Sequence, residues 1–180
     1  MSNEKYCVFL RGINVNGIKI KMQDLKTTFL NLGFSEVKTI LATGNVIFSL
    51  KEVKPEFELK EYIETELRKV FQYDAHVMLR SRSNIDSICQ KARELPLQEE
   101  HHLYVLLCES EEVVGELVAL FDTVEHSESE QVLPLRTELI WIVAKGETLE
   151  SQFGSKILGS KKYKDKLTSR NINTLEKMLI

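Results

Sequence analysis

The sequence lacks the features that mark secreted, membrane-spanning and metal-binding proteins. It has three cysteines in 180 residues, too few and too far apart for a disulfide framework or a CxxC metal motif. No stretch approaches the roughly 18 consecutive apolar residues of a membrane span, and the opening MSNEKY has no signal-peptide pattern. None of the four histidines stands at metal-ligand spacing. We therefore expect a cytoplasmic protein with reduced cysteines, no metal, no cofactor and no membrane contact.

What the sequence contains is the composition of a soluble globular chain, with 43% hydrophobic and 28% charged residues. Its net charge of −3 hides an uneven distribution. Residues 1–40 carry a net charge of +3, residues 155–180 one of +5, and residues 41–154 one of −11. The two basic ends flank an acidic middle. They can act together on a partner only if they lie within about a Debye length (~8 Å) of each other.

The pattern of apolar residues predicts two halves with a similar order of elements. The first half runs strand, helix, hairpin, helix and strand, which is the βαββαβ order of a ferredoxin-like unit. The second half begins again at HLYVLLC, with a helix in place of the last strand. We therefore predict an α+β fold of two ferredoxin-like halves, residues 1–80 and 81–180, with antiparallel sheets and a C-terminal helix.

The stretch LRGINVNGIKIKMQDL between the first strand and the first helix has more polar and flexible residues than a connector needs. A glycine-bearing loop of this kind, with Gly12, Asn14 and Gly17, exposes backbone N–H groups to an anion. Arg11 adds a planar guanidinium and Lys19 a point charge. The spacing R-G-x-N-x-N-G matches neither of the common nucleotide-binding fingerprints. The structural alternative is that the glycines make a turn, the asparagines bond to their own backbone and Arg11 pairs with a carboxylate.

The second polar motif is TSRN, residues 168–171. We predict that it precedes the terminal helix as an N-cap, with Asn173 and Glu176 spaced like a capping box. As a binding site, Thr168, Arg170 and Asn171 would supply the hydroxyl, guanidinium and amide groups that bind an oxyanion. The alternative is a capped helix with a surface arginine.

Two further motifs have both a structural and a functional interpretation. Thr43-Gly44-Asn45 fits hairpin geometry, and Asn45 could instead hold the opening loop in shape. Ser155 and Lys156 could act as a nucleophile and its base. Neighbouring residues on a helix point about 100° apart, however, so they cannot easily hydrogen-bond to each other.

Three stretches together resemble one family. LRGINVNG resembles its L-R-G-I-N-V-G-G opening, ATGNVIFS its S-G-N-V-x-F hairpin, and TSRNINTLEKML its T-x-R-N-W-x-T-x-x-K-L close. This is the bacterial domain-of-unknown-function family sixteen ninety-seven (DUF1697), and the resemblance spans nearly the whole chain. It departs at Asn16 and Ile172, where the family usually has glycine and tryptophan. The resemblance implies a compact α+β fold of duplicated ferredoxin-like type, and it brings no established activity, cofactor or substrate.

Our leading hypothesis is a protein that binds a small phosphorylated or otherwise anionic ligand at a basic site. The residues assigned to that site are Arg11, Gly12, Asn14, Gly17, Lys19, Asn45, Lys156, Thr168, Arg170 and Asn171. One alternative is a non-catalytic nucleic-acid or protein-binding module, and another is that the motifs only lock the two halves together. An RNA-recognition sheet needs aromatic residues where the third strand has Asn45 and Ile47, which leaves Phe9 alone to stack on a base. The sequence names no reaction and no oligomeric state.

Overall fold

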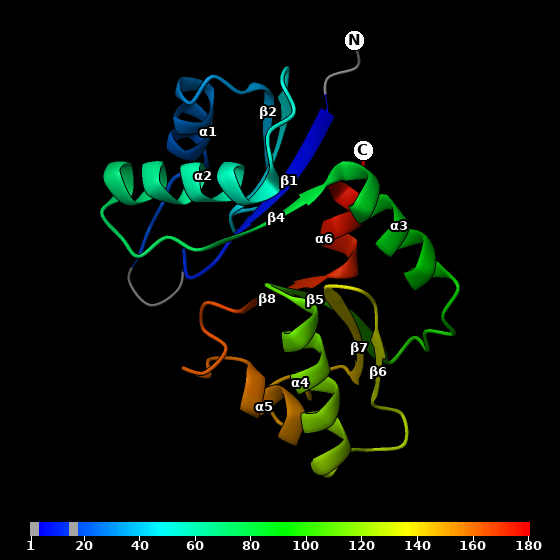
Figure 1. Cartoon of the computed structure of the whole chain (residues 1–180). Coiled ribbons are helices and arrows are strands. Elements are labelled where there is room, and N and C mark those ends of the chain that lie inside the picture. The colour runs from blue at the N-terminus through cyan, green and yellow to red at the C-terminus, as the bar shows by residue number, and fades with distance from the viewer. Residues whose placement is uncertain (1–3, 15–17) are drawn as a thin grey trace. The chain divides into compact units, whose positions relative to one another are not determined.

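The computed structural model describes residues 4–14 and 18–180 and divides the chain into two compact units (Figure 1). The first unit runs to Ile88 and also includes Thr174–Ile180, and the second unit is Cys89–Asn173. In chain order the elements are β1 (Glu4–Leu10), α1 (Met22–Asn31), β2 (Ser35–Ile40), β3 (Asn45–Leu50), α2 (Glu56–Phe71), β4 (Val77–Ser81), α3 (Arg82–Arg93), β5 (His101–Cys108), α4 (Glu111–Thr123), β6 (Gln131–Pro134), β7 (Glu138–Ala144), α5 (Gln152–Ile157), β8 (Leu167–Asn171) and α6 (Ile172–Lys177).

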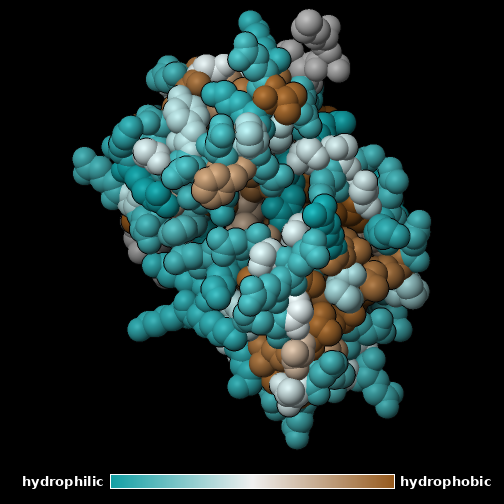
Figure 2. Space-filling model, in the orientation of Figure 1, coloured by the Kyte–Doolittle hydropathy of each residue, from teal (hydrophilic) through white to brown (hydrophobic). Residues whose placement is uncertain are grey.

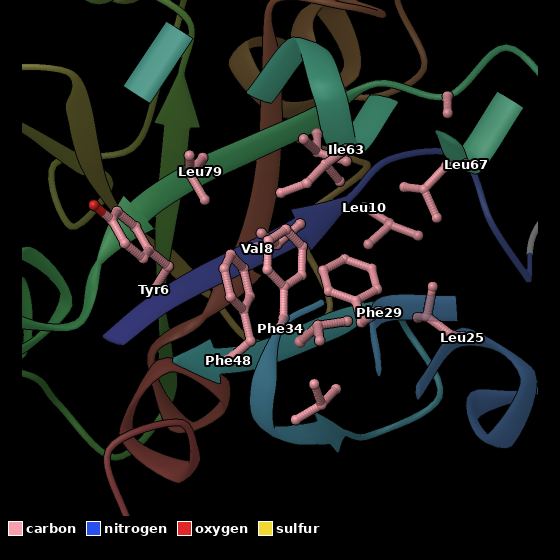
Figure 3. Packing of buried hydrophobic residues seen from close by; sticks show 14 of the residues in the cluster. Tyr6, Val8, Leu10, Leu25, Phe29, Phe34, Phe48, Ile63, Leu67 and Leu79 are labelled. Atoms are coloured by element: carbon pink, nitrogen blue, oxygen red, sulfur yellow. The ribbon is translucent and has the colours of Figure 1, made fainter. Parts of the chain in front are cut away.

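The first unit is built on a four-stranded antiparallel sheet in the order β2-β3-β1-β4. Alternate side chains of β1, namely Tyr6, Val8 and Leu10, point into one core together with Phe29 from α1 and Phe48 from β3 (Figure 3). The rings of Tyr6 and Phe48 stack with their centroids 5.7 Å apart. Each large apolar side chain contributes about 1.5–3 kcal/mol when it is buried. This cluster therefore holds α1 and α2 against the sheet.

The second unit has a sheet of the same kind, in the order β6-β7-β5-β8. Helices α4 and α5 pack on one of its faces through Leu117 and Phe153, which share a core with Trp141 of β7. The rings of Trp141 and Phe153 meet edge to face, 5.6 Å apart. The indole N–H of Trp141 donates to Oε1 of the buried Glu130 at 3.0 Å. The only polar atom of the largest buried side chain is therefore satisfied.

The motif TSRN lies in strand β8, so the prediction of a helix in place of the last strand is wrong. The prediction that TSRN caps the terminal helix is confirmed at Asn171, whose Oδ1 accepts from the N–H of Asn173. β8 pairs antiparallel with β5, where Thr168 stands opposite Leu107 and Asn171 opposite Tyr104. The terminal helix begins one residue later, at Ile172. Asparagine favours the N-cap position locally, and Asn171 both ends the strand that pairs with β5 and caps α6. The second unit thus has the element order βαββαβ, like the first.

Other predictions about the fold are confirmed. The chain has the α+β class, antiparallel sheets and a C-terminal helix. Residues 41–44 join β2 to β3 in a hairpin, and the three cysteines are buried and free. No helix within the described residues is both long and apolar enough for a membrane span. Figure 2 shows a mostly hydrophilic surface on which hydrophobic side chains gather over α4 and β6.

Candidate functional site

The opening loop is held in place from its first residues. The backbone N–H of Leu10 donates to the carbonyl of Gly44 (2.8 Å), and that of Arg11 donates to the carbonyl of His76 (3.0 Å). Gly12 has a φ of +72°, a conformation that glycine adopts without strain. The loop therefore starts as a tight turn between the ends of β3 and β4.

Asn14 shapes the next part of this loop. Its φ is +55°, which asparagine tolerates better than most residues. Its side-chain oxygen accepts from the N–H of Ile20 (3.0 Å), and its amide nitrogen donates to the carbonyls of Ile20 (3.3 Å) and Ala42 (2.5 Å). The side chain thus bonds to backbone on both sides of the loop and joins it to the hairpin turn. This is the structural role that the sequence offered as the alternative.

Asn45 is wholly buried at the start of β3. Its amide nitrogen donates to the carbonyl of Ile40 (2.8 Å) and to Oγ1 of Thr43 (2.9 Å), so these bonds fix the hairpin. Gly44 has a φ of +75°, and a Cβ there would lie 2.6 Å from Cδ1 of Ile13. Glycine is required at this turn for conformation and for space.

The remaining predicted residues of the loop differ in exposure. Arg11 is half-buried and Lys19 is exposed, while Gly17 lies outside the described residues. The first unit therefore gathers Arg11, Gly12, Asn14 and Asn45 around one loop and one turn. The side-chain hydrogen bonds of Asn14 and Asn45 described above go to neighbouring protein groups.

Four predicted residues belong to the second unit. Thr168 is buried in β8, and Nη1 of Arg170 donates to its Oγ1 (2.7 Å) and to the carbonyl of the intervening residue (2.9 Å). Lys156 is exposed on α5. The hydroxyl of Ser155 donates to the carbonyl of Gln152 within the same helix (3.0 Å). This bond provides no support for a serine–lysine pair. Asn171, the fourth residue, ends β8.

The lysine-rich segment before β8 contains an internal ion pair. Nζ of Lys162 lies 2.9 Å from Oε2 of Glu116 on α4. The hydrogen bond from Lys162 lowers the pKa of Glu116, and the same bond raises the pKa of Lys162. Lys162 also lies over the ring of Tyr163, 5.0 Å from its centroid. This lysine therefore helps to attach the segment to α4.

A pocket of about 360 Å³ opens in the second unit where β5 begins, β7 ends and β8 passes into α6. The side chains that give it chemical character are Glu99, His101, His102, Lys145, Asn171 and Asn173. Asn171 was predicted from the sequence as a binding residue, and the others were not. The pocket lies in the size range of small-molecule sites, about 300–1,000 Å³.

Strand register brings these residues together. His101 stands opposite Ala144, so that Lys145 follows directly at the end of β7, where its N–H donates to the carbonyl of Glu100 (2.9 Å). On the other side, Oδ1 of Asn171 accepts from the N–H of Asn173 (3.0 Å). Asn171 lines the pocket, where its side-chain amide is a candidate donor to a ligand.

His101 is the most unusual residue of the pocket. Both of its ring nitrogens are buried, and neither has a hydrogen-bond partner among the described residues. A buried polar atom without a partner costs about 1–3 kcal/mol. The neighbouring His102 instead contacts the ring of Tyr104 edge-on, with centroids 5.8 Å apart.

Strand alternation predicts that two adjacent histidines such as His101 and His102 point to opposite faces. At the very start of β5, however, both residues border the same pocket. The sequence feature that could have indicated this pocket was the pair of histidines at the first two positions of a buried strand. The lack of hydrogen-bond partners at His101 is a property of the folded structure that no local pattern contains.

Comparisons with known proteins give a family match and a fold. Residues 3–139 match the family described as "Protein of unknown function (DUF1697)". The chain is similar to a solved structure of a conserved bacterial protein from Streptococcus pneumoniae, with 22% sequence identity and a TM-score of 0.76. The match covers 98% of this chain and 97% of the chain of that structure. At this identity the likeness concerns the fold alone. No curated protein matches the chain.

Proposed function

The chain belongs to the DUF1697 family of proteins of unknown function, and from this premise we propose that it binds a small anionic ligand in the pocket at the start of β5. The family description names no activity. The proposal therefore rests on the chemistry of the pocket, and it assigns no reaction.

The observation that carries the proposal is the meeting of Lys145, Asn171 and Asn173 around one pocket beside His101 and His102. Lys145 adds a positive charge at the rim, and Asn171 adds an amide donor. Glu99 is the one carboxylate of the lining, and it is exposed. Lys145 and Glu99 balance in formal charge, so a preference for an anion such as a phosphate or a carboxylate would come from the amide donors of Asn171 and Asn173. Apolar lining from Leu97, Leu103 and Ile172 would suit a ligand that also has a hydrocarbon part.

The opening loop enters this proposal as a structural element. Asn14 and Asn45 use their side chains on the backbone of the loop and the hairpin. Ligand binding by Arg11, Gly12, Gly17 and Lys19, and by Lys156, Thr168 and Arg170 of the second unit, stays a prediction from the sequence.

The test is a titration with phosphate, sulfate and succinate, followed by thermal unfolding and amide NMR shifts. A ligand at 100 times its dissociation constant should stabilise the fold by about 2.7 kcal/mol. We expect Lys145→Ala to weaken binding, and Lys91→Ala, which removes an exposed lysine of α3 outside the pocket, to leave it unchanged. No response to any of the three anions at tens of millimolar, or an equal response in Lys145→Ala, would contradict the proposal.

We infer further that each unit is a ferredoxin-like fold. The orders β2-β3-β1-β4 and β6-β7-β5-β8 are equivalent when the strands of each unit are counted from its first strand. This equivalence supports duplication of one βαββαβ unit. The division into residues 1–80 and 81–180 stays a prediction about where independently folding halves would begin and end.

A second candidate function is protein binding without catalysis. β6 is one of the two edge strands of the second sheet, and its Leu133 is 38% exposed. The partly exposed Val118 and Leu120 lie on α4, where Figure 2 shows hydrophobic side chains at the surface. A second copy of the chain could pair with this edge. Concentration-dependent sedimentation that Leu133→Lys abolishes would support it, and a monomer at all concentrations would exclude self-pairing.

Nucleic-acid binding on the first sheet has less support. Phe9, the residue that the sequence left to stack on a base, is 0% exposed, and Ile47 is 7% exposed. A base cannot stack on a ring that solvent does not reach.

A further inference from the structure

We propose that the ligand of this pocket is a zwitterion, an α-amino acid with an apolar side chain, whose carboxylate binds Lys145 and whose ammonium binds Glu99. This inference rests on the proposed function. It adds a second, positively charged group to the anionic ligand and so narrows its chemical class.

Opposite charges on one pocket give the first argument. Apart from two histidines, the lining has one basic residue, Lys145, and one acidic residue, Glu99. A lysine ammonium only donates hydrogen bonds, and an ionised carboxylate only accepts them. The amides of Asn171 and Asn173 do both, so they suit either end of a ligand. The two charged side chains therefore decide the ligand class, and together they favour a molecule with one anionic and one cationic group.

The second argument is that these two side chains do not neutralise each other. Glu99 lies in the turn before β5, where the N–H of His101 donates to the carbonyl of Gln98 (3.0 Å), and the N–H of Lys145 donates to the carbonyl of Glu100 (2.9 Å). Their backbones are therefore neighbours. Within the part of the chain that the structure describes, however, neither side chain forms an ion pair. Both are exposed, and an ion pair between exposed side chains contributes little, so a ligand that binds both has no strong bond to break.

The apolar part of the lining gives the third argument. Leu97, Leu103 and Ile172 border the same pocket as the two charged side chains. An α-amino acid carries its carboxylate, its ammonium and its side chain on one carbon atom. A hydrocarbon side chain can therefore contact the apolar lining while the charged groups bind Lys145 and Glu99. The volume of about 360 Å³ lies in the lower part of the range for small-molecule sites, as a ligand of this size requires.

Three probes with one hydrocarbon skeleton test the assignment: leucine, isocaproate, which lacks the ammonium, and isoamylamine, which lacks the carboxylate. Amide NMR shifts at low salt measure their binding. We expect leucine to bind about fivefold more tightly than either of the others, the upper range for one exposed ion pair. Glu99→Gln should lower leucine affinity to that of isocaproate, and Lys145→Gln should lower it to that of isoamylamine. Glu94→Gln, which removes an exposed carboxylate outside the pocket, should leave leucine affinity unchanged.

The outcomes separate the inference from the proposed function. Isocaproate that binds as tightly as leucine would overturn the zwitterion and leave anion binding intact. Leucine affinity that survives Glu99→Gln would overturn the assignment of the ammonium to Glu99. Isoamylamine that binds as tightly as leucine would remove the role of Lys145 in binding an anion and overturn both proposals. No binding of leucine where phosphate or sulfate binds would overturn this inference alone, and no binding of any of these compounds would overturn both.

Discussion

The side chain of Asn14 stabilises the conformation of the opening loop through hydrogen bonds to the backbone. It occupies the left-handed region and bonds to the backbone of Ile20 and Ala42. The sequence suggests that such a polar loop binds a ligand, because asparagine and glycine occur in both anion-binding loops and ordinary turns. The structure resolves the ambiguity for Asn14 through the positions of its bonding partners, one of which lies 28 residues away in the hairpin.

We expect Asn14→Ala to lower the free energy of unfolding by about 1–3 kcal/mol, because three side-chain hydrogen bonds are lost and alanine disfavours a positive φ. Urea denaturation measures the change. Asn14→Gly is the matched control: it loses the same bonds but relieves the backbone, so it should be the more stable of the two variants. If both variants unfold at the same urea concentration as the unmodified protein, the loop does not depend on Asn14.

At the scale of elements, the sequence predicted what local chemistry decides and missed what distant pairing decides. The hairpin between β2 and β3 was predictable because Gly44 and Asn45 carry its turn geometry in adjacent residues. Strand β8 was not, because TSRN shows locally only the cap that Asn171 provides to α6, and its strand conformation depends on pairing with β5. The pocket could not be predicted from the sequence for the same reason. His101 lies on β5, Asn171 on β8, and Lys145 directly follows β7, and no single segment contains the register of these strands.

Helix α5 provides an element-scale prediction about packing. A Cβ on Gly154 would lie 1.9 Å from the carbonyl oxygen of Thr148 and 2.8 Å from Cη2 of Trp141. We expect Gly154→Ala to destabilise the protein by about 1–3 kcal/mol, because α5 must shift away from the sheet. The matched control is Gly115→Ala on α4, where the new methyl group meets no atom within 4 Å.

Gly115→Ala should stabilise the protein by about 0.5–1 kcal/mol, since alanine is the better helix former. Thermal unfolding of the two variants compares them directly. Equal shifts in the same direction would mean that helix propensity alone governs both positions, and that the close approach of α5 to Trp141 has no energetic consequence.

At the scale of the whole molecule, the path of the chain makes the first unit discontinuous. The chain enters the second unit within α3, between Ile88 and Cys89, and returns to the first within α6, between Asn173 and Thr174. The guanidinium of Arg82, at the start of α3, donates to the carbonyl of Leu179. The two residues lie 97 positions apart. The last seven residues of the chain are therefore part of the fold of the first unit.

This arrangement predicts that a destabilising substitution near the C-terminus lowers the stability of the first unit. Leu175 is 0% exposed in the segment that returns to the first unit, so Leu175→Ala should cost about 2–5 kcal/mol. Ile180 is 94% exposed, and Ile180→Ala should change stability by less than about 0.5 kcal/mol. Hydrogen exchange resolved by residue locates the effect. We expect Leu175→Ala to reduce protection in β1, β3 and β4 more than in β5 and β7, because the side chain is lost from the first unit. Greater loss of protection in β5 and β7 would place the C-terminal segment in the second unit and contradict this division of the chain.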